Sequence, residues 1–190
     1  MIYMHRFVKT LVLTLVSMII LCCNQCFAEY KYIPFFSENG YAQMRAPITW
    51  KQSYPGSIGD KTVLLQLTAP DANASAVLMF GNEYVPYNSL DDVSEEYLNS
   101  MVLNDITKLK SEYPSMVLLE TATNRRVKDV RNVSYVFDIT LPYGRYRYFT
   151  FKSIRNHHFH ILSIMAHESL IKQLDVVGMV YSLFVYGDKV

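Results

Sequence analysis

The chain has 190 residues and is nearly neutral, with 18 lysines and arginines against 17 aspartates and glutamates. This balance argues against a nucleic-acid surface, which needs an excess of positive charge. The 15 tyrosines and 10 phenylalanines favour a fold rich in sheet, where aromatic side chains pack well.

The first 28 residues have the layout of a secretory signal. A basic start precedes the apolar run Leu11–Leu21, and a small residue, Ala28, stands before Glu29. As a helix the run would be only about 16 Å long, about half of the hydrocarbon core of a bilayer. We therefore expect cleavage after Ala28, with residues 29–190 as a single exported domain. The alternative is an uncleaved anchor.

All three cysteines, Cys22, Cys23 and Cys26, lie within this predicted leader. A bacterial lipoprotein would need a small residue before the acylated cysteine, but Leu21, Cys22 and Gln25 occupy those positions. The sequence thus favours soluble export to the periplasm or the medium, with at most peripheral membrane contact. It leaves no thiol for a disulfide, a zinc ligand or a nucleophile.

Strand patterns open the predicted domain. Asn39-Gly40 predicts a turn before a short strand that Pro47 confines to an edge or ends. We expect Trp50 in the core. The segments 61–69 and 74–82 flank a turn-forming Pro-Asp-Ala-Asn sequence and predict a hairpin.

A long helix is predicted over Leu90–Ser111, because its apolar residues recur at spacings of three and four. Ser89 is a suitable N-cap, acidic residues follow it, and lysines precede Pro114 at the other end. These charges complement the helix dipole.

Four strands and a last helix complete the pattern. The strands are predicted over 115–123, 132–141, 145–153 and 159–166, and the helix over 169–185. The stripe expected to face the core consists of Leu170, Leu174, Val177, Tyr181 and Phe184. An antiparallel sheet with helices packed on it indicates an α+β fold.

This order resembles the PsbP-like family, whose members pair a Gly-aromatic…Pro-x-x-Trp first strand with a final helix ending in Ser and an aromatic residue. The matching positions are Gly40, Tyr41, Pro47, Trp50, Ser182 and Phe184. The resemblance implies an α/β/α sandwich on a central antiparallel sheet of about six strands. Relatives include extrinsic subunits of the oxygen-evolving complex, a Ran-binding import factor and exported bacterial proteins, without shared catalytic residues.

The segment Ser153–Met165 holds three of the five histidines. With a two-residue turn, strand alternation places His158 and His160 on the same face as Phe149 and Phe151. Two imidazoles on one strand can share a metal ion, but the sequence offers no obvious third ligand. We therefore interpret them as imidazoles at a strand end and keep a metal site as the alternative.

Two predicted turns carry exposed basic and aromatic residues that suit a partner surface. Arg125, Arg126 and Lys128 lie in one turn, and Tyr143 and Arg145 in another. Interleaved arginines and tyrosines also occur in RNA-binding strands, but the neutral charge and the predicted export argue against that function.

The usual local signatures of catalysis are missing: the chain has no Gly-x-Ser-x-Gly, no phosphate-binding Gly loop and no His-Glu-x-x-His. We expect a non-catalytic exported domain without a cofactor that binds, or helps assemble, another protein of the cell envelope. The alternatives are a metal-binding protein using His158 and His160, a carrier of an apolar small ligand, and an unrecognised hydrolase.

The predicted leader gives a direct test. The protein expressed with its own N-terminus should be recovered from the exported fraction beginning at Glu29, because the apolar run is too short to span a bilayer. Intact-mass measurement and N-terminal sequencing check this, and an intact leader or an acylated cysteine would contradict it.

Overall fold

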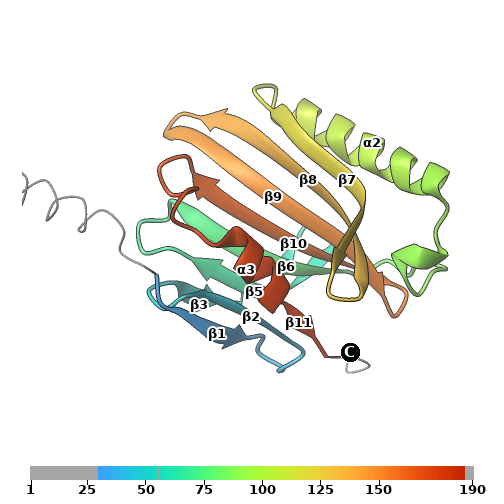
Figure 1. Cartoon of the computed structure of the whole chain (residues 1–190), viewed down its shortest axis with the longest axis horizontal. Coiled ribbons are helices and arrows are strands. Elements are labelled where there is room, and N and C mark those ends of the chain that lie inside the picture. The colour runs from blue at the N-terminus through green and yellow to red at the C-terminus, as the bar shows by residue number, and fades with distance from the viewer. Residues whose placement is uncertain (1–29, 55, 187–190) are drawn as a thin grey trace, which may run out of the picture. The chain divides into compact units, whose positions relative to one another are not determined.

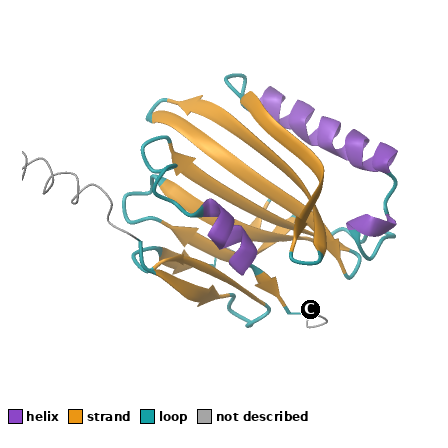
Figure 2. Ribbon diagram, viewed as in Figure 1, coloured by secondary structure: helices purple, strands orange, loops and turns teal. Residues whose placement is uncertain are grey.

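The computed structural model describes residues 30–54 and 56–186, so the predicted leader and its cysteines lie outside the described residues. The described part is dominated by strands, with one long helix, α2, and shorter helical segments beside them (Figures 1 and 2). The large sheet has the order β3 (Lys51–Ser53), β5 (Lys61–Thr68), β6 (Ala74–Gly81), β10 (His158–His167), β9 (Gly144–Arg155), β8 (Val130–Leu141) and β7 (Val117–Val127), with β4 (Ser57–Ile58) paired to β5. A small sheet consists of β1 (Tyr32–Phe36), β2 (Ala42–Pro47) and β11 (Phe184–Val185).

Six long strands, β5 to β10, form an antiparallel sheet, as the sequence predicts. Its strands β8 and β9 are buried on both faces, whereas the edge strand β7 is largely exposed. In β8, for example, Val133 and Phe137 are buried on one face, while Ser134 and Asp138 are buried on the other. Alternating side chains of a strand point to opposite faces, so each face must be covered by a separate layer.

The first face is covered by α2 (Glu95–Glu112), whose buried Leu98 and Val102 belong to one core cluster with Tyr135 and Ile139 of β8. The helix begins later than predicted. Ser94 is its N-cap, accepting a hydrogen bond from the Tyr97 backbone N–H at 3.2 Å.

The residues before α2 form a separate turn, η1 (Leu90–Asp92), because Ser89 and Asp92 cap each other reciprocally. Val93 is then extended, which breaks the helix that the periodicity predicted from Leu90. Within the described part of the chain, no helix has both the length and the apolar character needed to cross a membrane.

The second face is covered by the small sheet and by α3 (Val176–Ser182). This C-terminal helix is much shorter than the predicted 169–185, because Asp175 caps it by accepting from the Gly178 N–H at 2.8 Å. Its buried residues are Val176, Met179 and Val180. The stripe predicted to be buried is therefore wrong in part: Val177, Tyr181 and Phe184 are exposed.

The residues of the PsbP-like pattern have structural roles. Gly40 adopts a φ of 69° in the predicted turn, and Tyr41 and Trp50 are buried, which confirms the expected core position of Trp50. Ser182 Oγ accepts a 2.8 Å hydrogen bond from the Arg45 backbone N–H and thereby ties α3 to β2.

Truncation of Leu98 tests the packing of α2 on the first face. Leu98→Ala should lower the free energy of unfolding by about 2–5 kcal/mol, because the removed side chain is 0% exposed and leaves a cavity. Leu103→Ala is the control on the same helix. Leu103 is 64% exposed, so the change should stay within about 0.5 kcal/mol. Urea unfolding measures both, and equal losses would contradict this packing.

Candidate functional site

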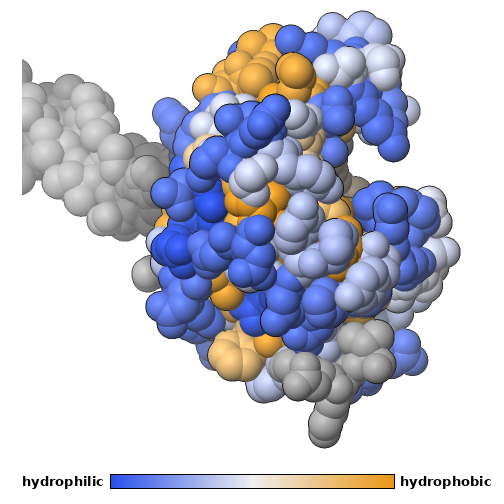
Figure 3. Space-filling view, turned by 90° about the vertical axis from the view of Figure 1, so that its right-hand side faces the viewer, coloured by the Kyte–Doolittle hydropathy of each residue, from blue (hydrophilic) through white to orange (hydrophobic). Residues whose placement is uncertain are grey.

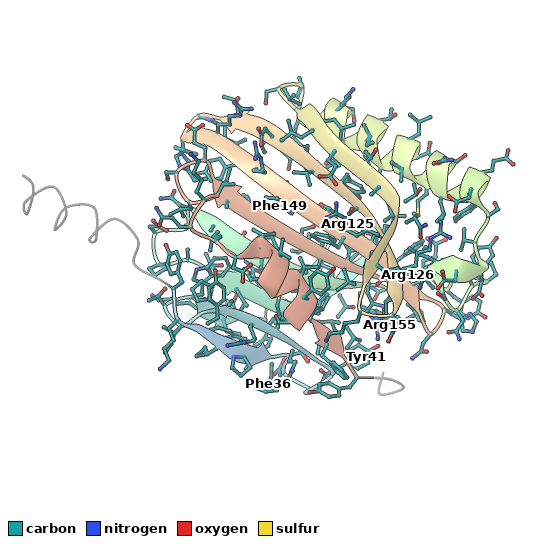
Figure 4. The ribbon with its side chains drawn as sticks, viewed as in Figure 1. Phe36, Tyr41, Arg125, Arg126, Phe149 and Arg155 are labelled. Carbon is teal, nitrogen blue, oxygen red and sulfur yellow. The ribbon has the colours of Figure 1, made fainter. Side chains whose placement is uncertain are left out.

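Two hairpin tips and the C-terminal strand meet at one end of the large sheet. The β7–β8 tip carries Lys128 and Asp129, and the β9–β10 tip carries Asn156 and His157. Figure 4 shows Tyr41, Arg126 and Arg155 at this end, near β11. A hollow of about 260 Å³ lies here, lined by Tyr41, Asn88, Ser89, Asp129, Val130, Ile154, Arg155, Asn156, Val185 and Tyr186.

Backbone strain accompanies both tips. Lys128, Asn156 and His157 have φ values of 55°, 48° and 66°, in the left-handed region that residues other than glycine seldom adopt. Positive φ at both Asn156 and His157 confirms the expected two-residue turn and fixes the direction in which Arg155 leaves the sheet.

A smaller cavity lies beneath α3, with room for roughly two water molecules in its 30 Å³. Its walls are mostly apolar, and its polar members are Lys128, Asn132, Ser153, Arg155 and His160. Val130, Arg155 and Val185 line both this inner cavity and the outer hollow. Arg155 therefore stands between the two.

A buried pair of aromatic rings connects the same two spaces. Tyr41, which lines the outer hollow, approaches His160 of the inner cavity with its hydroxyl 3.2 Å from Nε2. The other ring nitrogen of His160, Nδ1, is buried without a partner of normal hydrogen-bond geometry. Burial lowers the pKa of His160 to about 4, and the nearby Arg155 charge acts in the same direction. The imidazole is thus neutral at pH 7.

Arg155 has no acidic partner in the described part of the chain. Its guanidinium is half-buried and makes one long hydrogen bond, 3.4 Å from Nη1 to the Val185 carbonyl. Burial lowers the pKa of Arg155, although a guanidinium keeps its charge.

Other shielded cations contrast with Arg155. Arg131 pairs with Glu95, Arg147 with Asp138 at 2.8 Å, and Lys152 with Asp105 at 3.1 Å. Only such pairing normally offsets the desolvation of a charge. Arg155 therefore presents unused positive charge and unused donors toward both spaces.

Lys128 adds a second cation beside the inner cavity. Its Nζ donates to the Leu183 carbonyl at 3.2 Å and lies 4.9 Å from the centre of the Phe184 ring. These contacts hold the amine near α3 without neutralising it.

The residues predicted as a partner surface lie at two separate ends of β8. Arg125, Arg126 and Lys128 are at the tip described above, whereas Tyr143 and Arg145 are at the β8–β9 turn. Tyr143 is exposed, but the arginines are engaged by carboxylates: Arg125 with Glu120, Arg126 with Asp91 at 2.6 Å and Arg145 with Asp138 at 2.6 Å. Of the five, Lys128 alone joins the cavity.

The histidines of the hairpin have separate environments. His158 pairs across the hairpin with Arg155 and His160 with Ser153, so both share the predicted face with Phe151. His158 Nδ1 lies 3.0 Å from the Gly81 carbonyl, and the Phe80 ring contacts both imidazoles. No group of three or more potential metal ligands occurs among the residues that the structure describes.

Arg155 and Tyr41 were not predicted as site residues. A signal for Arg155 existed, because it shares its strand face with Phe149, Phe151 and Ser153. A cation in the core-facing register of a strand is unusual. No comparable sequence signal identified the inner cavity or the outer hollow, because both depend on where α3 and β11 end.

Comparisons with known proteins identify the fold class. No protein-family model matches the chain, and no curated protein matches it. The fold is similar to the solution structure of cyanobacterial PsbP (CyanoP) from Synechocystis, with a TM-score of 0.54, 8% identity and coverage of 85% of this chain and 95% of that one. It is also similar to the Ran-binding protein Mog1p of Saccharomyces cerevisiae, with a TM-score of 0.50, 12% identity and coverage of 82% and 96%.

A crystal structure from Bacteroides thetaiotaomicron matches with a TM-score of 0.48 and 11% identity over 83% of this chain, which spans 50% of that one. The chain thus has the PsbP/Mog1-like α+β fold, as its sequence pattern predicts.

The buried His160 predicts a pH dependence of stability. Its pKa is about 4 in the folded chain and 6.5 otherwise, so between these values the unfolded chain binds more protons. Stability should therefore fall as the pH drops from 6.5 to 4, by about 3 kcal/mol from this group. Tyr41, Arg155 and His158 face the imidazole, and none of them supplies a carboxylate to hold its proton.

Urea unfolding from pH 7 to pH 4 measures this slope. The slope should be shallower in His160→Phe, which lacks the imidazole, than in the wild type and in the control His167→Gln at a partly exposed position on the same strand. Identical pH profiles for the wild type and His160→Phe would contradict a neutral, buried His160.

Proposed function

We propose that this chain is an exported, non-catalytic domain that binds a protein partner in the cell envelope. The observation that carries the proposal is an exposed apolar surface directly beside an un-neutralised cation. We call it the docking surface. It comprises Val177, Tyr181, Phe184 and Tyr186, with Lys128 and Arg155 at its edge.

The docking surface exposes large side chains that usually lie in cores. Val177 and Tyr181 are 64% and 50% exposed on the outer face of α3, and Phe184 and Tyr186 on the adjoining segment are 44% and 40% exposed. The Phe184 and Tyr186 rings contact each other, with centroids 4.8 Å apart. Aromatic residues and arginine are the residue types enriched in the centres of protein interfaces.

The surroundings suit specific recognition. Figure 3 looks onto the end of the molecule with the hairpin tips, where the surface is largely hydrophilic and interrupted by apolar areas. A polar rim around an apolar centre is typical of interfaces that form between soluble partners. Mog1p, a fold neighbour, is named for binding the protein Ran, which supports protein recognition as a use of this architecture.

The alternatives receive less support. The histidine pair lacks a third ligand among the described residues. In addition, the Nε2 atom of His160 is engaged by the Tyr41 hydroxyl. An apolar carrier needs a pocket of several hundred Å³, whereas the cavity beneath α3 is about 30 Å³ and has two cations among its lining residues. The region beneath α2 is filled by the core cluster around Leu98. Export rests on the predicted leader, and the nearly neutral charge argues against nucleic acid.

Site-specific photocrosslinking in the native cell tests the proposal. A photoreactive amino acid at Tyr181 or Phe184 should form one discrete crosslinked species in the envelope fraction, because these side chains would lie in the interface. The control position is Leu103, which is 64% exposed on α2 at the opposite face of the sheet. It should give no such species.

Two outcomes would contradict the proposal. One is equal crosslinking from Tyr181 and Leu103, which indicates random encounter. The other is a full-length chain that stays in the cytoplasmic fraction, which would remove the envelope from the proposal and leave only the fold.

A further inference from the structure

We propose that the inner cavity beneath α3 binds a carboxylate group of a ligand, with Arg155 as its main charge partner and Lys128 as a second one. This inference deepens the proposed function, and it rests on that function where the carboxylate belongs to a protein partner. It assigns a binding role to Arg155, Lys128 and the cavity between them.

The charged side chains that line the cavity are all positive. Lys128 and Arg155 both line the cavity, and none of its lining residues is acidic. Neither cation has a carboxylate partner among the described residues, and each reaches only a backbone carbonyl, of Leu183 and Val185 respectively. A half-buried guanidinium with one long hydrogen bond loses free energy of hydration, and this loss is offset when an anion pairs with it.

The cavity also has buried polar side chains in its lining. Asn132, Ser153 and His160 are 7%, 8% and 3% exposed, yet they line the same small space. His160 Nδ1 lacks a well-placed partner, although the backbone of His158 stabilises its proton weakly. Buried polar groups normally have partners, so the unpartnered Nδ1 of His160 calls for a polar group in this cavity.

The size and shape of the cavity select the ligand class. The 30 Å³ available holds two oxygen-sized positions, which corresponds to the two oxygens of a carboxylate. Such a planar pair matches the planar donors of Arg155 in a bidentate arrangement. Val130, Val180 and Leu183 supply apolar walls for the carbon atoms attached to it. A phosphate would bring more oxygens and more charge than these walls accommodate.

The outer hollow provides the route of entry. It shares Val130, Arg155 and Val185 with the inner cavity, and its 260 Å³ can hold a few more atoms of the same ligand. Asp129, also on its lining, makes no ion pair with Arg155 and would repel a second negative charge at the mouth. We therefore expect a monocarboxylate, or a peptide ending in a free carboxylate, to bind better than a polyanion.

Titration of the exported protein, followed by calorimetry and by backbone NMR, tests the inference. Acetate and a tetrapeptide with a free C-terminus are the carboxylate probes, and the same peptide amidated and inorganic phosphate are the comparison probes. A carboxylate should shift the signals of Asn132 and Leu183 and raise the melting temperature, because it binds only the folded chain. Binding of the free peptide and not of its amide identifies a protein terminus as the source; binding of acetate alone identifies a small molecule.

Charge variants locate the site. Arg155→Gln should weaken carboxylate binding at least tenfold, and Lys128→Gln, at an exposed position that folding tolerates, about threefold. Arg126→Gln is the matched control on the same hairpin tip, and binding should stay within twofold of the wild type because Arg126 is paired with Asp91.

Several results would overturn the inference. They are no saturable shift with either carboxylate, equal binding by the wild type and Arg155→Gln, or preference for phosphate. Asp188 follows Tyr186 by two positions in the sequence, so Asp188→Asn is titrated in parallel. If Asp188→Asn binds the probes and the wild type does not, the Asp188 carboxylate of the chain itself occupies the site, and the inference of a separate ligand is overturned. Crosslinking at Tyr181 that persists while all carboxylates fail would refute the carboxylate site alone and leave the docking surface in place.

Discussion

The need to cover both faces of the long strands β8 and β9 is the constraint from which the rest of the structure follows. Strands as long as β8 and β9, with 12 residues each, extend about 40 Å, and both of their faces need cover. The 18 residues of α2 span about 27 Å of the first face, but the seven residues of α3 span only about 10 Å of the second. The small sheet covers part of the remainder. The inner cavity lies on the second face, where α3 and the small sheet end.

The pairing of the charged side chains depends on the same unequal cover of the two sheet faces. Where a face is well covered, a buried cation such as Arg131 is paired with a carboxylate, here that of the exposed Glu95, because an unpaired charge there would be prohibitive. At the hairpin tips, Arg155 lines the outer hollow and is only half-buried, so the desolvation of its guanidinium is incomplete. Incomplete cover thus makes an unpaired cation tolerable and, at the same time, makes it accessible to a ligand.

The sequence predicts the fold far better than the site. Hydrophobic alternation predicts the six long strands, because the alternation of side chains between two faces can be seen within the sequence of each strand. The periodicity of residues 169–185 predicted the wrong helix face. Leu174 is buried but lies before α3, and Val177 and Tyr181 are exposed. Capping decided the helix boundaries: Asp175 and Ser94 start α3 and α2 later than their apolar residues suggest. Arg155 left a signal in its register, whereas its missing partner is a property of the assembled structure.

The separation of fold from site means that the fold alone does not determine what this chain binds. The sheet depends on residues in strand interiors, where chemically similar side chains can replace one another without altering the alternation. The cavity depends on strand ends and turns: Lys128, Arg155 and Val185 come from three segments that no single motif contains. At 8–12% identity, CyanoP and Mog1p share the first set of constraints with this chain. The carboxylate binding proposed above depends on the second set, at the hairpin tips, where the described carboxylates of the chain leave Lys128 and Arg155 unpaired.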